Sequence, residues 1–197
     1  MALDYSKFEI IDDYLPEDQY NQLRRYFLGP DCYWYFCGNY GGGYPQMEHV
    51  FYNELVGPQR YARTDTVSDG INVLSPLLAT FNYACLVRIR AVLNWRTDTS
   101  TMTQRDWHVD VPFDCTTAIY YLHDSDGKTI FKDGDNEPLE CETKANRLVK
   151  FPSSYEHAVT PFTTPNMRSV INFNFIEPKP QKGAFITHHL ATQHPMS

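Results

Sequence analysis

The stretch WHVDVPFDCTTAIYYL, residues 107–122, places a candidate metal-binding pair directly before an apolar strand pattern. His108 and Asp110 are two residues apart, so on a strand their side chains point to the same face. An imidazole and a carboxylate that share a face can bind one metal ion. By itself a histidine two residues before an aspartate is a weak signal, because most such pairs are solvated surface residues. The pair therefore needs support from the surrounding sequence.

Around this stretch, short apolar runs alternate with turn residues, which predicts a series of short strands. The expected strands lie at about Cys85–Leu93, Trp107–Val111, Thr116–Leu122, Thr129–Phe131, Leu139–Thr143, Arg147–Phe151, His157–Thr160 and Arg168–Ile176. Upstream, we expect helices from about Pro16 to Leu28 and within Val73–Asn82, with an aromatic strand at Tyr33–Cys37 between them. Helices followed by many short strands predict an α+β fold, in which a closed or sandwiched antiparallel barrel packs against the helices.

The composition is that of one globular domain. The chain has 197 residues and is 42% hydrophobic, enough for a sizeable core. We expect a single domain over residues 1–177, with its strand core at about 84–176, and a C-terminal arm at 178–197. The net charge of −7 disfavours nucleic acid and anionic membranes as partners. Five cysteines without CxxC spacing, no membrane-spanning run and no secretory signal at Met1–Asp12 predict free buried thiols and a cytoplasmic protein.

Two later residues complete a constellation around His108 and Asp110. His157 would supply a third ligand, and two histidines with one carboxylate leave three positions of an iron(II) ion open, as in non-haem iron oxygenases. Arg168 follows His157 by eleven residues, enough for a strand, a loop and the start of an antiparallel neighbour. A guanidinium there can hold the far carboxylate of 2-oxoglutarate in a charge-assisted pair. The set therefore predicts an Fe(II) site with 2-oxoglutarate as co-substrate.

The order of these segments resembles the prolyl-4-hydroxylase-like 2-oxoglutarate oxygenases. The resemblance covers roughly residues 85–176. It is closest to small phage- and bacteria-encoded members and extends more distantly to hypoxia-sensing prolyl hydroxylases. The segments that carry it are WHVD (107–110), TAIYYL (117–122), NRLVKF (146–151), HAV (157–159) and RSVINFNF (168–175). Their ordered set is specific, although no single segment is. The resemblance implies a double-stranded β-helix core, a distorted jelly roll.

The resemblance also implies an activity and residue roles. Such enzymes couple the oxidative decarboxylation of 2-oxoglutarate, to succinate and carbon dioxide, to hydroxylation of a C–H bond, using Fe(II), O2 and ascorbate as reductant. By position, Arg168 would pair with the C5 carboxylate of 2-oxoglutarate and Tyr121 would hydrogen-bond it. Asn94 or Arg90 would contact the C1 carboxylate. Asn172, on the Arg168 face of its strand, would lie deeper toward the iron.

The strand expected at Arg168–Ile176 has two unlike faces. Asn172 and Asn174 share the polar face with Arg168, and both would lie toward the iron. The apolar face should pack on the helices and consists of Ile171, Phe173 and Phe175.

The substrate class is left open by the sequence. Asp110 favours hydroxylation over halogenation, because related halogenases lack this carboxylate so that chloride can take its place. A prolyl or other peptidyl substrate is the leading interpretation, by resemblance. The alternatives are a small-molecule hydroxylase and a non-catalytic metal-binding module of the same fold, although every expected ligand is present. Leu93-Asn94-Trp95 stands where the hypoxia-sensing relatives carry a tyrosine over the co-substrate, so the C1 contact is also open.

Several other features carry weaker predictions. The Ser- and Thr-rich connection Arg96–Arg105 runs into the metal-bearing segment and is a candidate lid over the site. His49 and His123 have no partner pattern and are expected on the surface. The tail histidines are expected to be solvated, since no spaced carboxylate or cysteine joins them; they are His188, His189 and His194.

Overall fold

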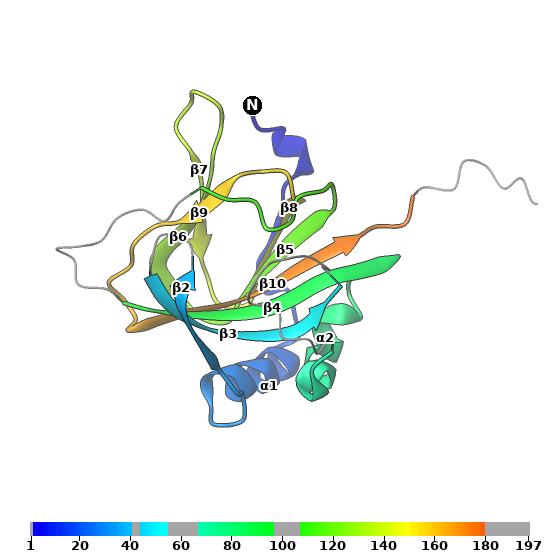
Figure 1. Cartoon of the computed structure of the whole chain (residues 1–197), viewed down its shortest axis with the longest axis vertical. Coiled ribbons are helices and arrows are strands. Elements are labelled where there is room, and N and C mark those ends of the chain that lie inside the picture. The colour runs from blue at the N-terminus through cyan, green and yellow to red at the C-terminus, as the bar shows by residue number, and fades with distance from the viewer. Residues whose placement is uncertain (1, 41–43, 55–66, 97–106, 180–197) are drawn as a thin grey trace, which may run out of the picture.

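The computed structural model of the chain describes residues 2–40, 44–54, 67–96 and 107–179. These residues form two antiparallel sheets, one of seven strands in the order β1-β8-β5-β10-β4-β3-β2 and one of three strands in the order β7-β6-β9. The smaller sheet lies over one face of the larger, and the helices α1 and α2 cover the opposite face (Figure 1). The larger sheet thus separates a helix-covered core from the space between the sheets.

The helices are η1 (Tyr5–Lys7), α1 (Glu17–Leu28), η2 (Asp69–Leu74) and α2 (Ser75–Leu78), of which η1 and η2 are short 3-10 helices. The strands are β1 (Glu9–Ile11), β2 (Tyr35–Tyr40), β3 (Tyr44–Asn53), β4 (Cys85–Trp95), β5 (Thr116–Tyr121), β6 (Ser125–Phe131), β7 (Leu139–Thr143), β8 (Arg147–Pro152), β9 (His157–Val159) and β10 (Met167–Ile176). No helix in these ranges is long and apolar enough to cross a membrane.

The core beneath the larger sheet forms as its sequence pattern predicts. Helix α1 has acidic residues in its first turn and an arginine in its last, both favourable to the helix dipole. Leu23 and Phe27, one helical turn apart, are buried in one cluster with Phe173 and Phe175 of β10. The expected packing of the apolar face of β10 on the helices is therefore confirmed.

Removing one of these aromatic side chains should be costly. Phe173 is completely buried and its ring meets the Phe81 ring edge-on at 5.0 Å between centroids. Phe173→Ala is expected to lower the free energy of unfolding by about 3–5 kcal/mol, the cost of a large buried cavity. Urea unfolding measures it, with Phe36→Ala as the control, since that side chain is 69% exposed. Equal losses in the two variants would show that β10 does not carry the core.

The opposite face of β10 and its neighbours presents polar side chains to the space between the sheets. In the β10–β4 register, Arg168 lies opposite Asn94, Asn172 opposite Arg90, and Asn174 opposite Arg88. Because partners in register point to the same face, three cross-strand pairs of polar side chains line this space. The polar residues that alternate along these two strands therefore form one polar surface on this face of the sheet.

Some expected elements differ from the structure. Trp107–Val111 was expected to be a strand, but within it only His108 pairs, in an isolated bridge to His157. Pro112 follows at once and has no N–H with which to continue a ladder. Strands β1 and β3 were not expected. The second helix begins earlier than Val73 and consists of η2 and the single turn of α2.

Two histidines expected at the surface lie elsewhere. His49 is 5% exposed, its ring stacks on Phe51, and its nitrogens contact the carbonyl of Tyr33 at 2.7 Å and the hydroxyl of Ser68 at 2.8 Å. His123 is half-buried and accepts a hydrogen bond from the backbone N–H of Ser169 at 3.0 Å. Both therefore hold neighbouring segments together.

The cysteines form no disulfide, although not all of them are buried. Cys32, Cys37 and Cys141 are buried, Cys115 is half-buried and Cys85 is exposed. The expectation of free thiols is met, whereas that of uniform burial is wrong for the last two.

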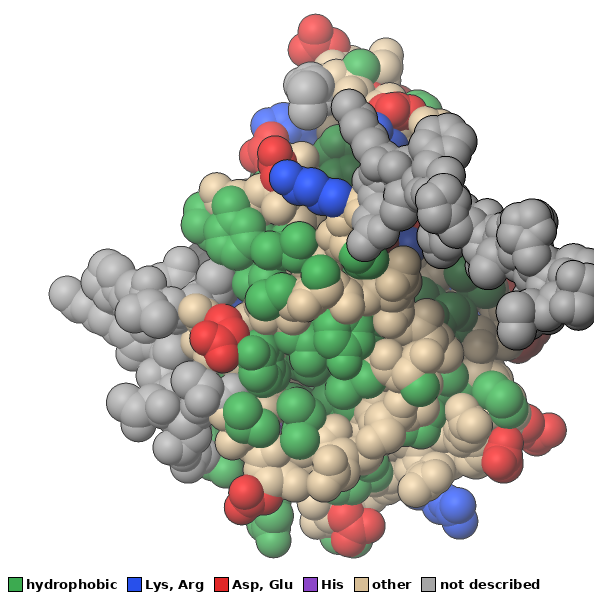
Figure 2. Space-filling model, turned by 90° about the vertical axis from the view of Figure 1, so that its right-hand side faces the viewer, with side chains coloured by type: hydrophobic (Ala, Val, Ile, Leu, Met, Phe, Trp, Pro, Cys, Tyr) green, Lys and Arg blue, Asp and Glu red, His purple; other side chains and the backbone are tan. Residues whose placement is uncertain are grey.

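One face of the molecule shows how the surface charge is arranged. Figure 2 shows hydrophobic side chains gathered near its centre and acidic side chains around its rim. Where side chains are described, this face presents no broad basic surface. The candidate lid from residue 97 to 105, the tail histidines and the arm from residue 180 onward lie outside the described residues.

Candidate metal centre

Three side chains with metal-ligating atoms meet between the two sheets. One ligand atom from each of His108, Asp110 and His157 lies within 4.8 Å of the others. The backbones of the two histidines pair, with His108 N–H donating to the His157 carbonyl at 3.1 Å and His157 N–H donating back at 2.9 Å. This bridge brings the imidazole centroids to 4.6 Å from each other. The structure thus assembles the predicted triad, although the first two residues do not lie on a regular strand.

The Asp110 carboxylate has two oxygens in different surroundings. Oδ1 accepts a hydrogen bond from Arg88 Nη2 at 2.8 Å. Oδ2 is buried without a hydrogen-bond partner among the described residues and lies 3.9 Å from His157 Nε2. A buried carboxylate oxygen without a donor is costly. A divalent cation held by the three side chains would satisfy it, so the residues present fit Fe(II).

The ionisation states suit a metal site as well. Burial alone would raise the pKa of Asp110, but the charges of Arg88, His157 and Arg90 outweigh it and hold the pKa well below its usual value. Burial lowers the pKa of His157 to about 4, against the opposing effect of Asp110. The site therefore offers a carboxylate and a neutral imidazole at neutral pH, the forms that bind a metal.

The ring of His157 is oriented by its backbone surroundings. Its Nδ1 lies 3.2 Å from the carbonyl oxygen of Tyr155. In the tautomer that donates from Nδ1 to this carbonyl, the lone pair of Nε2 faces the Asp110 carboxylate. In metal-binding histidines, a hydrogen bond from the nitrogen that does not bind the metal usually fixes the tautomer and the orientation of the ring.

A cavity of about 290 Å³ adjoins the triad. Its wall includes two of the ligands, His108 and His157, together with Arg168. Apolar side chains make up much of the rest, namely Val92, Ile119, Val159 and Val170. Two candidate metal ligands and the buried cation Arg168 therefore border the same cavity, and apolar side chains form much of the rest of its wall.

Arg168 is a buried cation whose hydrogen-bond partners among the described residues are neutral. It is 1% exposed, its Nε donates to Thr143 Oγ1 at 3.1 Å, and its Nη2 donates to Thr129 Oγ1 at 3.0 Å. Within the described ranges, no carboxylate lies at ion-pair distance from it. Burial lowers the pKa of Arg168, yet a guanidinium stays charged in a protein. An anion in the cavity would therefore find an unneutralised partner.

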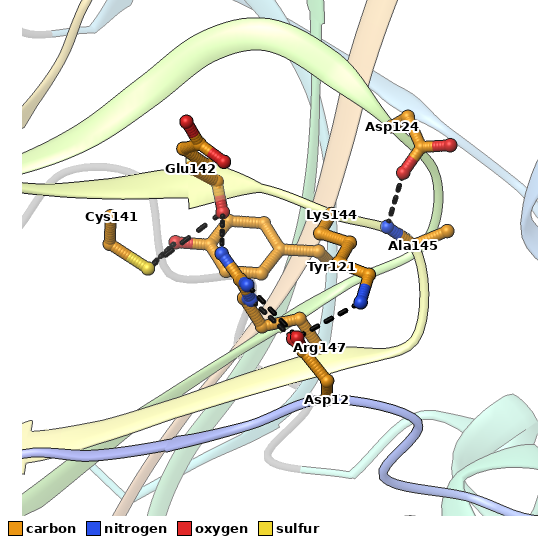
Figure 3. Close-up of polar contacts among 8 residues, drawn as sticks. All are labelled: Asp12, Tyr121, Asp124, Cys141, Glu142, Lys144, Ala145 and Arg147. Carbon is orange, nitrogen blue, oxygen red and sulfur yellow. Dashed lines mark hydrogen bonds and ion pairs between the residues drawn. The ribbon is translucent and has the colours of Figure 1, made fainter.

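Tyr121 lies beneath this arginine. The guanidinium sits 5.5 Å from the centroid of the Tyr121 ring, and the hydroxyl donates to Thr129 Oγ1 at 2.8 Å. Figure 3 shows the same hydroxyl beside the thiol of Cys141, 3.8 Å away. Tyr121 is not part of the cavity wall. The predicted hydrogen bond from Tyr121 to the co-substrate stays a prediction; the observed contacts orient Arg168.

The remaining predicted residues, Arg90, Asn94 and Asn172, all line the cavity. Arg90 Nη2 lies 3.9 Å from Asp110 Oδ1, which places Arg90 at the metal end. Asn94 lies opposite Arg168 in the β-sheet register, at the other end. Of the two candidates for the C1 carboxylate, Arg90 is therefore better placed. Asn172 Oδ1 is buried without a hydrogen-bond partner among the described residues.

Some residues of the site were not singled out from the sequence. Thr129 and Thr143 hold the Arg168 guanidinium, and Gln46 of β3 lines the cavity. Glu48 of the same strand lies 3.7 Å from Arg90 Nη1. The threonines belong to strands that were expected, so their inward parity was available as a signal. The two β3 residues had none, because the strand itself was not expected.

Comparisons with known proteins agree with the fold. Residues 96–176, which contain the triad and Arg168, match the model of the 2OG-Fe(II) oxygenase superfamily. No curated protein matches the chain. A prolyl hydroxylase from Trichoplax adhaerens, solved with a hypoxia-inducible factor peptide, is 14% identical with a TM-score of 0.59, over 87% of this chain and 84% of that one.

Two further solved structures are similar. A prolyl-4-hydroxylase from Pseudomonas putida is 15% identical with a TM-score of 0.52, over 87% of this chain and 94% of that one. The non-haem α-ketoglutarate-dependent epimerase of nogalamycin biosynthesis is 14% identical with a TM-score of 0.60, over 87% and 78%. At such low identity these likenesses show the fold.

The fold is the predicted antiparallel double-stranded β-helix, and a cluster of two histidines and one aspartate that could hold a metal ion lies between its sheets. The match of residues 96–176 to the 2OG-Fe(II) oxygenase superfamily, a family of oxidoreductases, supports the family predicted from the sequence.

Proposed function

We propose that the protein is an Fe(II)- and 2-oxoglutarate-dependent dioxygenase that hydroxylates a C–H bond of a prolyl or other peptidyl substrate. The observation that carries the proposal is the shared cavity. It joins His108 and His157 of the triad to Arg168, a buried cation that has no anionic partner among the described residues. Two of the similar structures are prolyl hydroxylases, one of them bound to a peptide, which supports the substrate class.

Each group of residues has a role in this proposal. His108, Asp110 and His157 would hold Fe(II), and Arg168 would bind the C5 carboxylate of 2-oxoglutarate. Bound Fe(II) would supply the oxidation of 2-oxoglutarate by dioxygen to succinate and carbon dioxide, with the second oxygen atom entering the substrate C–H bond. The apolar side chains along the cavity would exclude water. Arg90, beside Asp110, would take the C1 carboxylate.

A direct test measures succinate. The protein is incubated with Fe(II), ascorbate and 2-oxoglutarate, with and without a pool of proline-containing peptides. Peptide-dependent succinate, together with peptides heavier by one oxygen atom, is the expected result. An oxygenated small molecule from a host lysate, with no effect of peptides, would instead support small-molecule hydroxylation. Absence of any 2-oxoglutarate turnover, coupled or uncoupled, would support a non-catalytic metal-binding module.

Thr129 offers a test of the proposed co-substrate anchor that leaves the metal ligands untouched. Its Oγ1 accepts from both Arg168 Nη2 and the Tyr121 hydroxyl. Thr129→Val keeps the shape but removes this acceptor, so the dissociation constant of 2-oxoglutarate should rise by about tenfold. That figure is the lower end for losing a hydrogen bond to a charged group. Anaerobic calorimetry on the metal-loaded protein measures it, with Thr116→Val as the control. Unchanged affinity would mean that Arg168 does not depend on Thr129.

A further inference from the structure

A row of polar side chains connects the candidate metal ligand Asp110 to the interior of the larger sheet. Arg88 of β4, Asn174 of β10 and Thr117 of β5 lie side by side in the sheet register. All three are buried, with exposed fractions of 8% or less. The row begins at the Asp110 carboxylate, where Arg88 Nη2 donates to Oδ1 at 2.8 Å.

The hydrogen bonds along the row fix the orientation of each member. Arg88 Nε donates to Asn174 Oδ1 at 3.2 Å, and Asn174 Nδ2 donates to Thr117 Oγ1 at 2.9 Å. Flipping the Asn174 amide would set its NH2 group against the guanidinium and lose the bond from Arg88, whereas the Thr117 hydroxyl can bond to either orientation. The amide therefore has one orientation, and through it the guanidinium plane is fixed with Nη2 toward Asp110. A buried, fully bonded network of this kind is rigid.

The row makes the two oxygens of Asp110 unequal. Oδ1 is bound by Arg88, and a second cation, Arg90, lies 3.9 Å from it. Oδ2 faces His157 Nε2 at 3.9 Å and has no donor within the described residues. A cation held by the triad would therefore meet Oδ2, while Oδ1 is already engaged in a charge-assisted hydrogen bond.

This inequality matters because of how carboxylates bind metals. A carboxylate can bind a divalent ion through one oxygen or through both, and the second mode occupies an additional coordination position. A two-histidine, one-carboxylate site needs its three open positions. Two of them are required for a bidentate 2-oxoglutarate and one for dioxygen.

We propose that Arg88, oriented by Asn174 and Thr117, is a positioning residue that keeps Asp110 a one-oxygen ligand and so preserves the position that 2-oxoglutarate needs. The inference rests on the proposed function, since it takes Asp110 to be a metal ligand. It differs from charge balance alone, which any nearby cation would supply and which Arg90 already supplies in part.

Co(II) is the probe for the experiment, because its visible absorption reports coordination number and because the Co(II) protein does not turn over. The variant Arg88→Met removes the donors, and Asn174→Leu keeps the Arg88 charge but removes its orienting partner. Arg147→Met is the matched control: this strand arginine forms an ion pair with Asp12 at 2.6 Å, away from the cavity wall (Figure 3). Arg88→Lys serves if the methionine variant does not fold, since it keeps the charge without the planar fork.

The expected result separates metal binding from co-substrate binding. In Arg88→Met and Asn174→Leu, the Co(II) affinity should fall by no more than about 10–100-fold, the usual effect of a group that orients a ligand. The Co(II) spectrum should change before 2-oxoglutarate is added, and the affinity of the loaded protein for 2-oxoglutarate should fall by tenfold or more. The Arg147 control should match the wild type in all three measurements.

Two other outcomes would overturn the inference, and a third concerns the metal site. If Arg88→Met and Asn174→Leu kept the wild-type Co(II) spectrum and 2-oxoglutarate affinity, Arg88 would serve only to balance the charge of Asp110. A loss in Arg88→Met that Arg88→Lys fully restores, with Asn174→Leu unaffected, would lead to the same conclusion. Asp110→Asn with wild-type Co(II) affinity would instead remove the proposed metal site and this inference with it.

Discussion

Replacing Asp110 with alanine is expected to weaken Fe(II) binding by more than about 100-fold, since losing a group that only orients a ligand already costs about 10–100-fold. The variant removes the anionic member of a triad whose other two members are histidines. It also empties the buried place of the carboxylate beside two arginines, Arg88 and Arg90, which lie 2.8 Å and 3.9 Å from Oδ1 in the wild type. Without the Asp110 carboxylate these two guanidinium groups repel a metal ion, although Arg90 keeps its ion pair with Glu48.

Anaerobic competition against a chelator measures the affinity of each variant. Asp110→Asn is the isosteric comparison, because its amide oxygen can still accept from Arg88 while the negative charge is gone. Asp114→Ala is the matched control, since this carboxylate is exposed and outside the triad. Wild-type affinity and turnover in Asp110→Ala would show that the cluster is not the metal site. A loss in Asp114→Ala as well would point to a general effect of charge.

The inner face of the larger sheet could be predicted from residue alternation. Arg90 and Asn94 of one strand and Arg168 and Asn172 of the other line the same cavity, as their parity predicts, and Arg88 shares their face of the sheet. Alternation fixes the face that a side chain occupies, whatever the length of the strand. It does not fix which strand is the neighbour. The contact between Arg88 and Asp110, 22 residues apart, therefore had no local signal.

Strand β3 escaped prediction for a physical reason. In its pairing with β4, Gln46 lines the cavity and Glu48 contacts Arg90, while His49 stacks on Phe51, which is buried against the helices. Polar residues on the cavity face and a histidine on the core face blur the apolar alternation that marks a half-buried strand. Burial of Gln46, 2% exposed, follows only from the tertiary fold. A strand whose cavity-lining residues are polar therefore lacks the apolar alternation by which strands are predicted.

The structure brings His108 and Asp110 together with His157 as the sequence predicted, but the strand expected at Trp107–Val111 is wrong. His108 and Asp110 were placed on one face of a strand, whereas the chain bends directly after the single bridge to His157. The bridge supplies the register that a full strand would have supplied. Asp110 then reaches the site from the bend, where Arg88 fixes its carboxylate. Long-range contacts here replace the local geometry on which the prediction relied.

Arg168→Ala is expected to raise the dissociation constant of 2-oxoglutarate by at least about 30-fold, with Fe(II) affinity nearly intact. The reason is that truncating one member of a buried charged pair costs about 2–5 kcal/mol, and each 1.4 kcal/mol is tenfold. Arg168→Lys should recover part of the loss, because a lysine carries the charge but not the planar fork. Anaerobic calorimetry on the metal-loaded protein measures both, with Arg147→Ala as the control. Unchanged affinity in Arg168→Ala would place the anchor at another cation, with Arg90 the next candidate.

Arg168 is expected to aid 2-oxoglutarate binding but not to stabilise the fold of the protein without ligands. Among the described residues, Arg168 is buried with hydroxyl partners only, so without 2-oxoglutarate none of them supplies an anion that offsets its desolvation. Arg168→Met, which fills a similar volume, should therefore leave the free energy of unfolding equal to or above that of the wild type. Adding metal and 2-oxoglutarate at 100 times the wild-type dissociation constant should then stabilise the wild type by about 2.7 kcal/mol and the variant far less. A large loss of stability in ligand-free Arg168→Met would show instead that the arginine is needed to hold the fold, and that binding an anion is not its main role.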